Sequence, residues 1–171
     1  MIKKLTIPVD HGNRNMKTTH FLFTTGLSAT DRKPAGREDF LQTEGKYYVL
    51  SGKRIPYQRD KTQDERFSIL TRFAIAKELE RTGQVAEEDV VQVSLPIGVP
   101  PKHYAELADR YREYFLGDGK VQELVYNGRT YHTCIRDVAV YPQAYAAMMT
   151  EGEKIRQIPK AVGIDIGGFT S

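Results

Sequence analysis

Two short turns that contain glycine lie near opposite ends of this sequence, and each follows an apolar run that predicts a β-strand. The first spans residues 9–17 (VDHGNRNMK) and the second residues 162–170 (VGIDIGGFT). An aspartate, Asp10 or Asp165, stands at the end of each strand, with glycines shortly after it. Glycine lets the backbone approach a ligand closely, and successive backbone N–H groups in such turns bind anions. The two turns together predict a clamp for phosphate groups and their metal ion.

Length and composition predict one folded domain. The chain has 171 residues, of which 40% are hydrophobic and 27% charged. A chain of this size buries roughly 70% of the surface that it exposes when unfolded. This composition is that of an ordinary globular protein and differs from that of disordered chains.

The net charge of +3 is small, and lysine and arginine are interspersed with aspartate and glutamate. Such a distribution is not the basic footprint of a nucleic-acid-binding domain. The most basic stretch, residues 53–61, predicts a solvated loop; contact with DNA or a partner protein is the alternative.

The single cysteine, Cys134, excludes an internal disulfide and is typical of a reducing cytoplasm. We expect its side chain to be buried. No apolar run approaches the ~18 residues of a membrane span, and the N-terminus lacks the apolar region of a secretory signal. The sequence therefore predicts a cytoplasmic protein without membrane contact.

In the first half, hydrophobic periodicity predicts a hairpin, an irregular segment and a helix. Apolar residues at positions 5, 7 and 9 and the pattern of residues 16–23 form the hairpin strands around the first turn. Residues 24–60 are rich in glycine, proline and charge, with one clear strand at residues 46–50. A capping box at residues 62–65 then begins a helix over residues 63–81, which ends at Gly83.

The second half predicts further strands and two helices. A buried strand over residues 89–95 ends at the Pro-Ile-Gly sequence that follows, and Pro100 and Pro101 begin a helix that runs to Phe115. Asn127-Gly128 joins a hairpin of residues 121–126 and 129–135. The remaining predicted elements are a strand at 138–140, a helix over 142–149, a loop over 152–159 and a strand over 160–166.

Four motifs, in this order and spacing, resemble the N-terminal half of the bacterial actin-like plasmid-segregation ATPases of the ParM/StbA family. They are the first turn at residues 10–17, the strand at residues 90–96, the segment at residues 138–143 and the second turn at residues 165–170. This family belongs to the wider superfamily of actin, chaperone ATPases and sugar kinases.

The resemblance implies roles for the first turn in binding ATP or GTP with Mg²⁺. Asp10 resembles the residue that holds the hydrated metal ion, and Lys17 resembles the phosphate-binding lysine. Backbone N–H groups of Gly12, Asn13 and Arg14 are expected to face the phosphates, and Asn15 to fix the turn. Without the second turn, a plain hairpin turn would be the simpler interpretation. His11 is expected to be a turn residue with no role as a base.

The resemblance also implies a second group of site residues. Asp165 resembles a metal-side carboxylate with a catalytic role, and Gly167, Gly168 and Thr170 resemble the second phosphate cradle. Gln143 matches the position of the side chain that orients the attacking water. Its alternative is a glutamine at a helix start that faces solvent.

The implied fold is α/β: domain I of the actin fold, which is ribonuclease H-like, with a mixed sheet flanked by helices. Residues 1–157 would form this domain, with a small inserted subdomain at about residues 24–61. Residues 158–171 would begin domain II, so the sequence would cover only the first half of such a protein and have little activity alone.

The implied function is nucleotide-dependent assembly into filaments that segregate plasmid or phage DNA. The expected partners are other filament protomers and a DNA-binding adaptor protein, with no direct contact to nucleic acid. Because fold does not fix function, two alternatives stay open. One is a kinase or phosphatase of the same superfamily, and the other is a non-catalytic assembly module.

Overall fold

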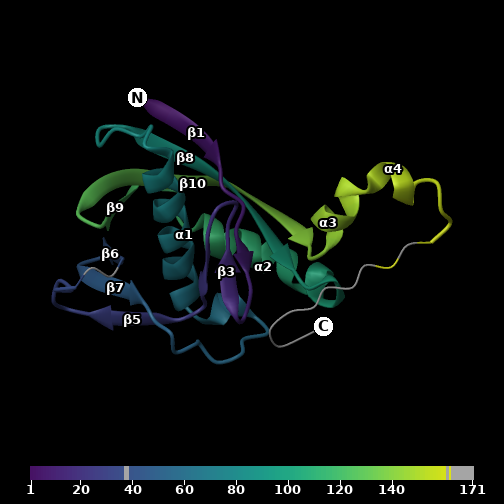
Figure 1. The fold of residues 1–171 in the computed structure, drawn as a ribbon, viewed down its shortest axis with the longest axis horizontal. Helices are drawn as coiled ribbons and strands as arrows, with labels where there is room; N and C mark the ends of the chain where they lie inside the picture. Colours follow the sequence, from purple (N-terminus) through teal and green to yellow (C-terminus); the bar gives the residue numbers. More distant parts are fainter. Residues whose placement is uncertain (37–38, 161, 163–171) are drawn as a thin grey trace.

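The computed structural model describes residues 1–36, 39–160 and 162 (Figure 1). It contains a seven-stranded mixed sheet, a small antiparallel sheet and flanking helices, which confirms the predicted α/β class. The large sheet comprises, in spatial order, β1 (Ile2–Thr6), β8 (Val90–Val99), β10 (Arg129–Pro142), β9 (Gln122–Tyr126), β6 (Phe40–Thr43), β7 (Lys46–Leu50) and β5 (Leu27–Thr30). The small sheet comprises β2 (Asp10–His11), β3 (Asn15–Lys17) and β4 (Leu22–Thr24). The helices are η1 (Lys61–Gln63), α1 (Arg66–Thr82), η2 (Pro101–His103), α2 (Tyr104–Leu116), α3 (Tyr145–Thr150) and α4 (Gly152–Ile155).

The parallel part of the large sheet is built around β8, which pairs with β1 on one side and β10 on the other. Burial alternates along β8, as expected for a strand with one face against the core. In Figure 1 the sheet arches over α1 and α2, with β8 and β10 above them and β5 and β7 below. The inward side chains of β8 are at most 3% exposed; they are Val91, Val93, Leu95, Ile97 and Val99.

The predicted helix of residues 63–81 is α1, but the predicted capping box is wrong. Glu65 makes no capping hydrogen bond, and the Asp64 carboxylate instead accepts from the backbone N–H of Arg66 at 3.1 Å. Thr62 belongs to η1, where its N–H donates to the Asp60 side chain. Asp64 fits the capping position better because its backbone is extended, whereas that of Glu65 is already helical. The Asp64 carboxylate is also ion-paired to the Arg66 side chain at 2.6 Å. The predicted end at Gly83 is confirmed.

One strand of the large sheet is longer than predicted. The strand predicted to end at residue 95 continues to Val99. Pro96 is tolerated because its missing N–H faces the segment just beyond β1, where regular pairing has ended, and its carbonyl still accepts from Val9 N at 2.9 Å.

The strands predicted at residues 129–135 and 138–140 are one strand, β10. Its register to β8 shifts by one residue between Ile135 and Asp137, which leaves Arg136 as the extra residue of a β-bulge. Buried side chains stand at the odd positions 131 and 133 before the bulge and at the even positions 138 and 140 after it, so the hydrophobic alternation of the sequence breaks there. Cys134, on this strand, is free and buried, as predicted.

The N-terminal region contains more strands than predicted. The predicted strand of residues 16–23 is divided into β3 and β4, because the chain reverses where Thr18 N donates to Phe21 O at 2.9 Å. Residues 24–60 contain β5, β6 and β7 rather than one strand, and β6 joins them to the large sheet through β9. Glu44 and Gly45 both have positive φ and form the β6–β7 hairpin turn. The extent of an inserted subdomain at residues 24–61, like the boundary at residue 157, stays a prediction.

Beyond β10 the chain forms two short helices that extend to one side of the sheet (Figure 1). The helix predicted over 142–149 is α3, which begins at Tyr145, and the predicted loop of 152–159 contains α4. The predicted strand of residues 160–166 lies outside the described residues, apart from positions 160 and 162. Within the described ranges, no helix has the length and apolarity needed to cross a membrane.

The C-cap of α1 gives a stability test. Gly83 adopts φ of 61°, and a Cβ added at this position would meet no atom of the described residues within 4 Å. Gly83→Ala should therefore lower the free energy of unfolding by about 1 kcal/mol through backbone strain alone. Gly52→Ala is the matched control, since Gly52 also faces open space but lacks a positive φ. Urea unfolding of both variants measures the difference, and equal stabilities would contradict the assignment.

Candidate functional site

A cavity of about 320 Å³ lies where the carboxyl ends of the parallel strands meet. Its walls come from four segments: residues 8–10, 17–19, 96–98 and 141–144. Parallel strands place their carboxyl ends at the same edge of a sheet, which is where ligands bind in many open α/β folds. The topology therefore brings Asp10, Lys17 and Gln143 to one cavity, although they are remote in sequence.

Asp10 and Lys17 face each other across the β2–β3 pair. The Lys17 Nζ lies 3.3 Å from Asp10 Oδ2, and 57% of the lysine side chain is exposed. The other carboxylate oxygen, Asp10 Oδ1, is buried and has no hydrogen-bond partner among the residues that the structure describes. A buried carboxylate oxygen without a partner is costly, so this atom is suited to a cation or an ordered water molecule. These residues fit a hydrated magnesium ion next to phosphate.

Gln143 is held at the opposite strand end by its backbone. Its N–H donates to the carbonyl of Val99, at the end of β8, at 2.7 Å. Ala144, the next residue, has φ of 63°, a strained conformation for alanine that often marks functional segments. Gly98 packs against the glutamine, because a Cβ there would lie 3.1 Å from Gln143 Cγ. Gln143 therefore lines the cavity and is only partly exposed.

The turn between Asp10 and Lys17 is tight, but it does not line this cavity. At Gly12 a Cβ would lie 2.4 Å from the Asn15 carbonyl oxygen, so a side chain cannot be accommodated without a shift. Asn13 Oδ1 accepts from Gln58 N at 3.4 Å. The predicted phosphate contacts of Gly12, Asn13 and Arg14, and the turn-fixing role of Asn15, stay predictions. The glycine requirement is explained by the turn itself.

The second predicted group of site residues belongs to the second turn. Asp165, Gly167, Gly168 and Thr170 all lie outside the described residues. Their predicted positions opposite Asp10, and the catalytic and metal-binding roles of Asp165, are therefore untested by the geometry.

His11 was expected to be an ordinary turn residue, and this prediction is wrong. Its side chain is 1% exposed and packs on the Phe115 ring at a centroid distance of 4.4 Å. Because the Thr71 hydroxyl donates to the carbonyl of Phe67, it accepts a hydrogen bond from His11 Nε2 at 2.7 Å. Burial and the positive charge of Lys61 lower the pKa of His11 to about 3, so the ring is neutral. The alternation of Ile7, Val9 and His11 was the signal for this inward position.

Lys61 is a second buried residue, although the sequence pattern predicted a solvated loop at this position. It is 4% exposed, and its ammonium lies 5.7 Å from the centroid of the Phe67 ring. Burial lowers the pKa of Lys61, and the negative charges of Asp10 and Asp60 oppose this effect. A lysine ammonium is therefore held within the electrostatic field of Asp10. The buried Tyr111, which accepts from Lys61 N at 3.1 Å, holds this segment in place.

Comparison with known proteins identifies the fold of the actin-like proteins. The family model described as the actin-like proteins N-terminal domain matches residues 8–145. A 15-stranded ParM filament from Clostridium botulinum is 14% identical, with a TM-score of 0.66 over 96% of this chain and 56% of that one. An AlfA filament bound to AMPPNP is 15% identical, with a TM-score of 0.64 over 85% of this chain and 56% of that one.

A further solved structure, that of Ta0583, an archaeal actin homologue, is 17% identical, with a TM-score of 0.64 over 88% of this chain and 49% of that one. The chain thus spans about half the length of these three proteins. No curated protein matches the sequence.

The buried neutral His11 predicts acid sensitivity. Since its pKa is about 3 in the folded state against an ordinary 6.5, the unfolded chain takes up the proton first as the pH falls. The free energy of unfolding should therefore decrease between pH 6.5 and pH 3, by on the order of 4 kcal/mol from this residue. Urea unfolding in EDTA at a series of pH values measures the slope.

The matched variant is His11→Gln, whose amide can still donate to Thr71 but does not titrate. Its stability should depend less steeply on pH than that of the wild type, with pH 7.5 as the common reference. Parallel pH profiles for the two proteins would show that His11 does not cause the acid sensitivity.

Proposed function

Because the chain belongs to the family of actin-like proteins and corresponds to their N-terminal domain, we propose that it is the nucleotide-binding half of a filament-forming ATPase or GTPase. The observation that carries this proposal is the cavity that joins Asp10, Lys17 and Gln143. The AMPPNP in the related AlfA filament supports a nucleotide as the ligand. The ParM filament supports self-association as the use of that nucleotide.

The chemistry expected at this site is mainly positioning and charge stabilisation. When bound, Mg²⁺ would neutralise charge on the phosphate oxygens. Asp10 would hold the ion or its water through the free oxygen Oδ1, and Lys17 would bind phosphate oxygens through its exposed ammonium. Gln143 would orient the attacking water by hydrogen bonding. Asp165 and the glycines of the second turn would complete the site from the other side.

In the cell, the filament would segregate plasmid or phage DNA through a DNA-binding adaptor protein, in the reducing cytoplasm. Such a role needs no direct contact between this chain and DNA, in keeping with its mixed surface charge. A kinase or phosphatase on the same scaffold is the competing enzyme function, and a non-catalytic assembly module is the competing binding function.

Gln143→Ala in the full-length protein tests the hydrolytic role. Phosphate release should slow by about ten- to a hundredfold, because the water is no longer oriented, whereas nucleotide affinity should change by less than about threefold. A phosphate-release assay and titration with AMPPNP measure the two effects. Gln157→Ala, at an exposed position outside the cavity, is the control. Unchanged turnover in Gln143→Ala would remove this residue from the mechanism.

Light scattering of the full-length protein separates the competing functions. We expect scattering to rise when ATP or GTP is added with Mg²⁺ and to fall when EDTA removes the ion. Asp10→Asn should abolish this response by removing the metal-side charge. Phosphorylated small molecules without polymers would instead indicate a kinase. Neither polymers nor turnover would indicate an assembly module.

A further inference from the structure

Helix α1 carries a buried carboxylate, Glu78, which is 6% exposed and faces the small sheet. It accepts three hydrogen bonds: from Thr18 Oγ1 at 2.5 Å, from His20 N at 3.0 Å and from His20 Nδ1 at 2.7 Å. All of these donors belong to residues 18–21, the turn that joins β3 to β4. We propose that Glu78 is a positioning residue of the nucleotide site, which fixes this turn and, through it, Lys17. The inference rests on the function proposed above.

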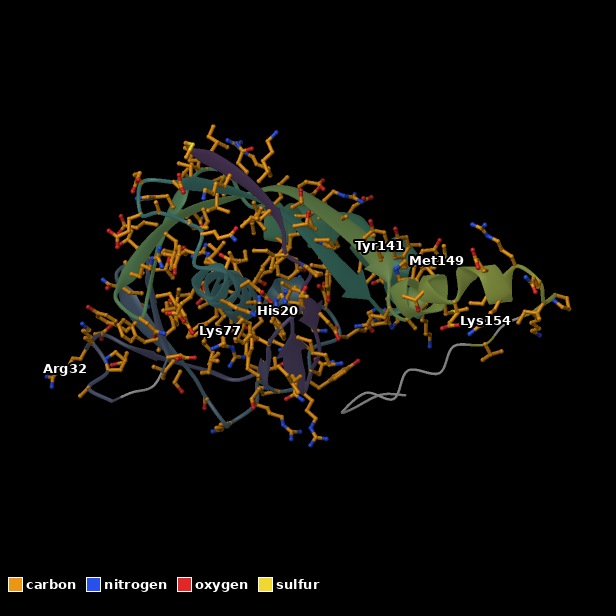
Figure 2. All side chains as sticks on the ribbon, turned by 45° about the horizontal axis from the view of Figure 1, so that its top comes forward. His20, Arg32, Lys77, Tyr141, Met149 and Lys154 are labelled. Atoms are coloured by element: carbon orange, nitrogen blue, oxygen red, sulfur yellow. The ribbon has the colours of Figure 1, made fainter. Side chains whose placement is uncertain are left out.

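The turn is held from several directions. Thr18 Oγ1 donates to Glu78 and accepts from Phe21 N at 3.0 Å, while Thr18 N donates to Phe21 O. The ammonium of Lys77, the residue before Glu78, lies 5.0 Å from the centroid of the Phe21 ring. Figure 2 labels His20 on the small-sheet side and Lys77 on α1, and the two lie in the same region of the molecule. Two consecutive residues of α1 therefore hold one four-residue turn.

The same turn forms part of the cavity wall. Thr18 and Thr19 line the cavity next to Lys17. Lys17 itself is paired with Asp10 on one side and with Leu22 on the other, and Leu22 directly follows the turn. If the turn shifts, the pairing between Lys17 and Leu22 shifts with it. The position of the Lys17 ammonium therefore depends on the contact between Glu78 and the turn.

Stability alone does not account for a carboxylate at this position. Burial raises the pKa of Glu78, but the hydrogen bonds from Thr18 and His20 more than offset this effect and hold the pKa below its usual value. Glu78 is thus ionised, and removing a carboxylate from water is costly even when it is well paired. Apolar residues in place of both the carboxylate and its donors would pack α1 at least as stably, whereas loss of the carboxylate alone leaves the donors of Thr18 and His20 unpaired. The carboxylate adds directional hydrogen bonds. Because it accepts from three donors of the turn, it allows only one arrangement of that turn.

Hydrogen–deuterium exchange and nucleotide titration together test the proposal in the full-length protein. In Glu78→Ala, the amides of residues 18–21 should exchange at least tenfold faster, and the affinity for Mg²⁺ with AMPPNP or GMPPNP should fall about tenfold. In a Lys17→Ala background, Glu78→Ala should cause no further loss, because the two residues act through the same contact. Additive losses would overturn the proposal.

Two matched variants make the result specific. Glu78→Gln should recover most of the affinity, since its amide oxygen can still accept from Thr18 and from His20 N; it also serves if Glu78→Ala does not fold. Glu80→Gln, an exposed carboxylate on the same helix, should leave affinity and exchange unchanged. Faster exchange in Glu78→Ala without loss of affinity would show a purely structural role and overturn the proposal.

The same measurements distinguish failure of the proposed nucleotide-binding function from failure of the positioning role of Glu78. If the wild-type protein binds neither nucleotide, the proposed function fails, and the positioning role fails with it. If the wild type binds nucleotide and Glu78→Ala binds it equally well, only the positioning role fails.

Discussion

The parallel pairing of β1, β8 and β10 is the interaction on which the rest of the structure depends. β1 and β8 are far apart in sequence, yet Ile2 pairs with Val90 and Thr6 with Ser94. Past the end of this regular ladder, two further hydrogen bonds link the segments: Ile7 N donates to the carbonyl of Ser94, and Val9 N donates to the carbonyl of Pro96. Long-range pairing of this kind has a high entropic cost, which the apolar inner face of β8 offsets by burial. The cavity exists because these strands end together.

Around that cavity, Asp10 keeps one carboxylate oxygen without a partner in the described part of the chain. Lys17 reaches the other oxygen from the exposed side, and Lys61 supplies positive charge from the buried side. His11, next in the chain, is held neutral by burial and adds no charge. Such an arrangement leaves the carboxylate accessible to a ligand, which supports the proposed binding of a metal ion and phosphate.

Local patterns predicted the elements well where a single chemical rule decided them. Gly83 ends α1 and Asn127-Gly128 forms the β9–β10 hairpin, because positive φ is required at those positions. The placement of Asp10, Lys17 and Gln143 in one cavity followed from the family resemblance. Burial of His11 and Lys61 could not be predicted in the same way, because it depends on Phe67, Thr71 and Phe115, which tertiary packing brings to them. Glu78 looked like any helix-surface glutamate, since its partners lie 58 to 60 positions away.

The bulge in β10 determines where the coding sequence of this strand can lose a codon without disturbing the sheet. Arg136 has no counterpart on β8, so one codon can be lost there while Ile135 and Asp137 keep their partners Val93 and Ser94. Loss of a codon between positions 138 and 142 would instead disturb the register that delivers Gln143 to Val99. Insertions and deletions accepted during evolution of this strand should therefore concentrate at the bulge, and the segment after it should vary by substitution only.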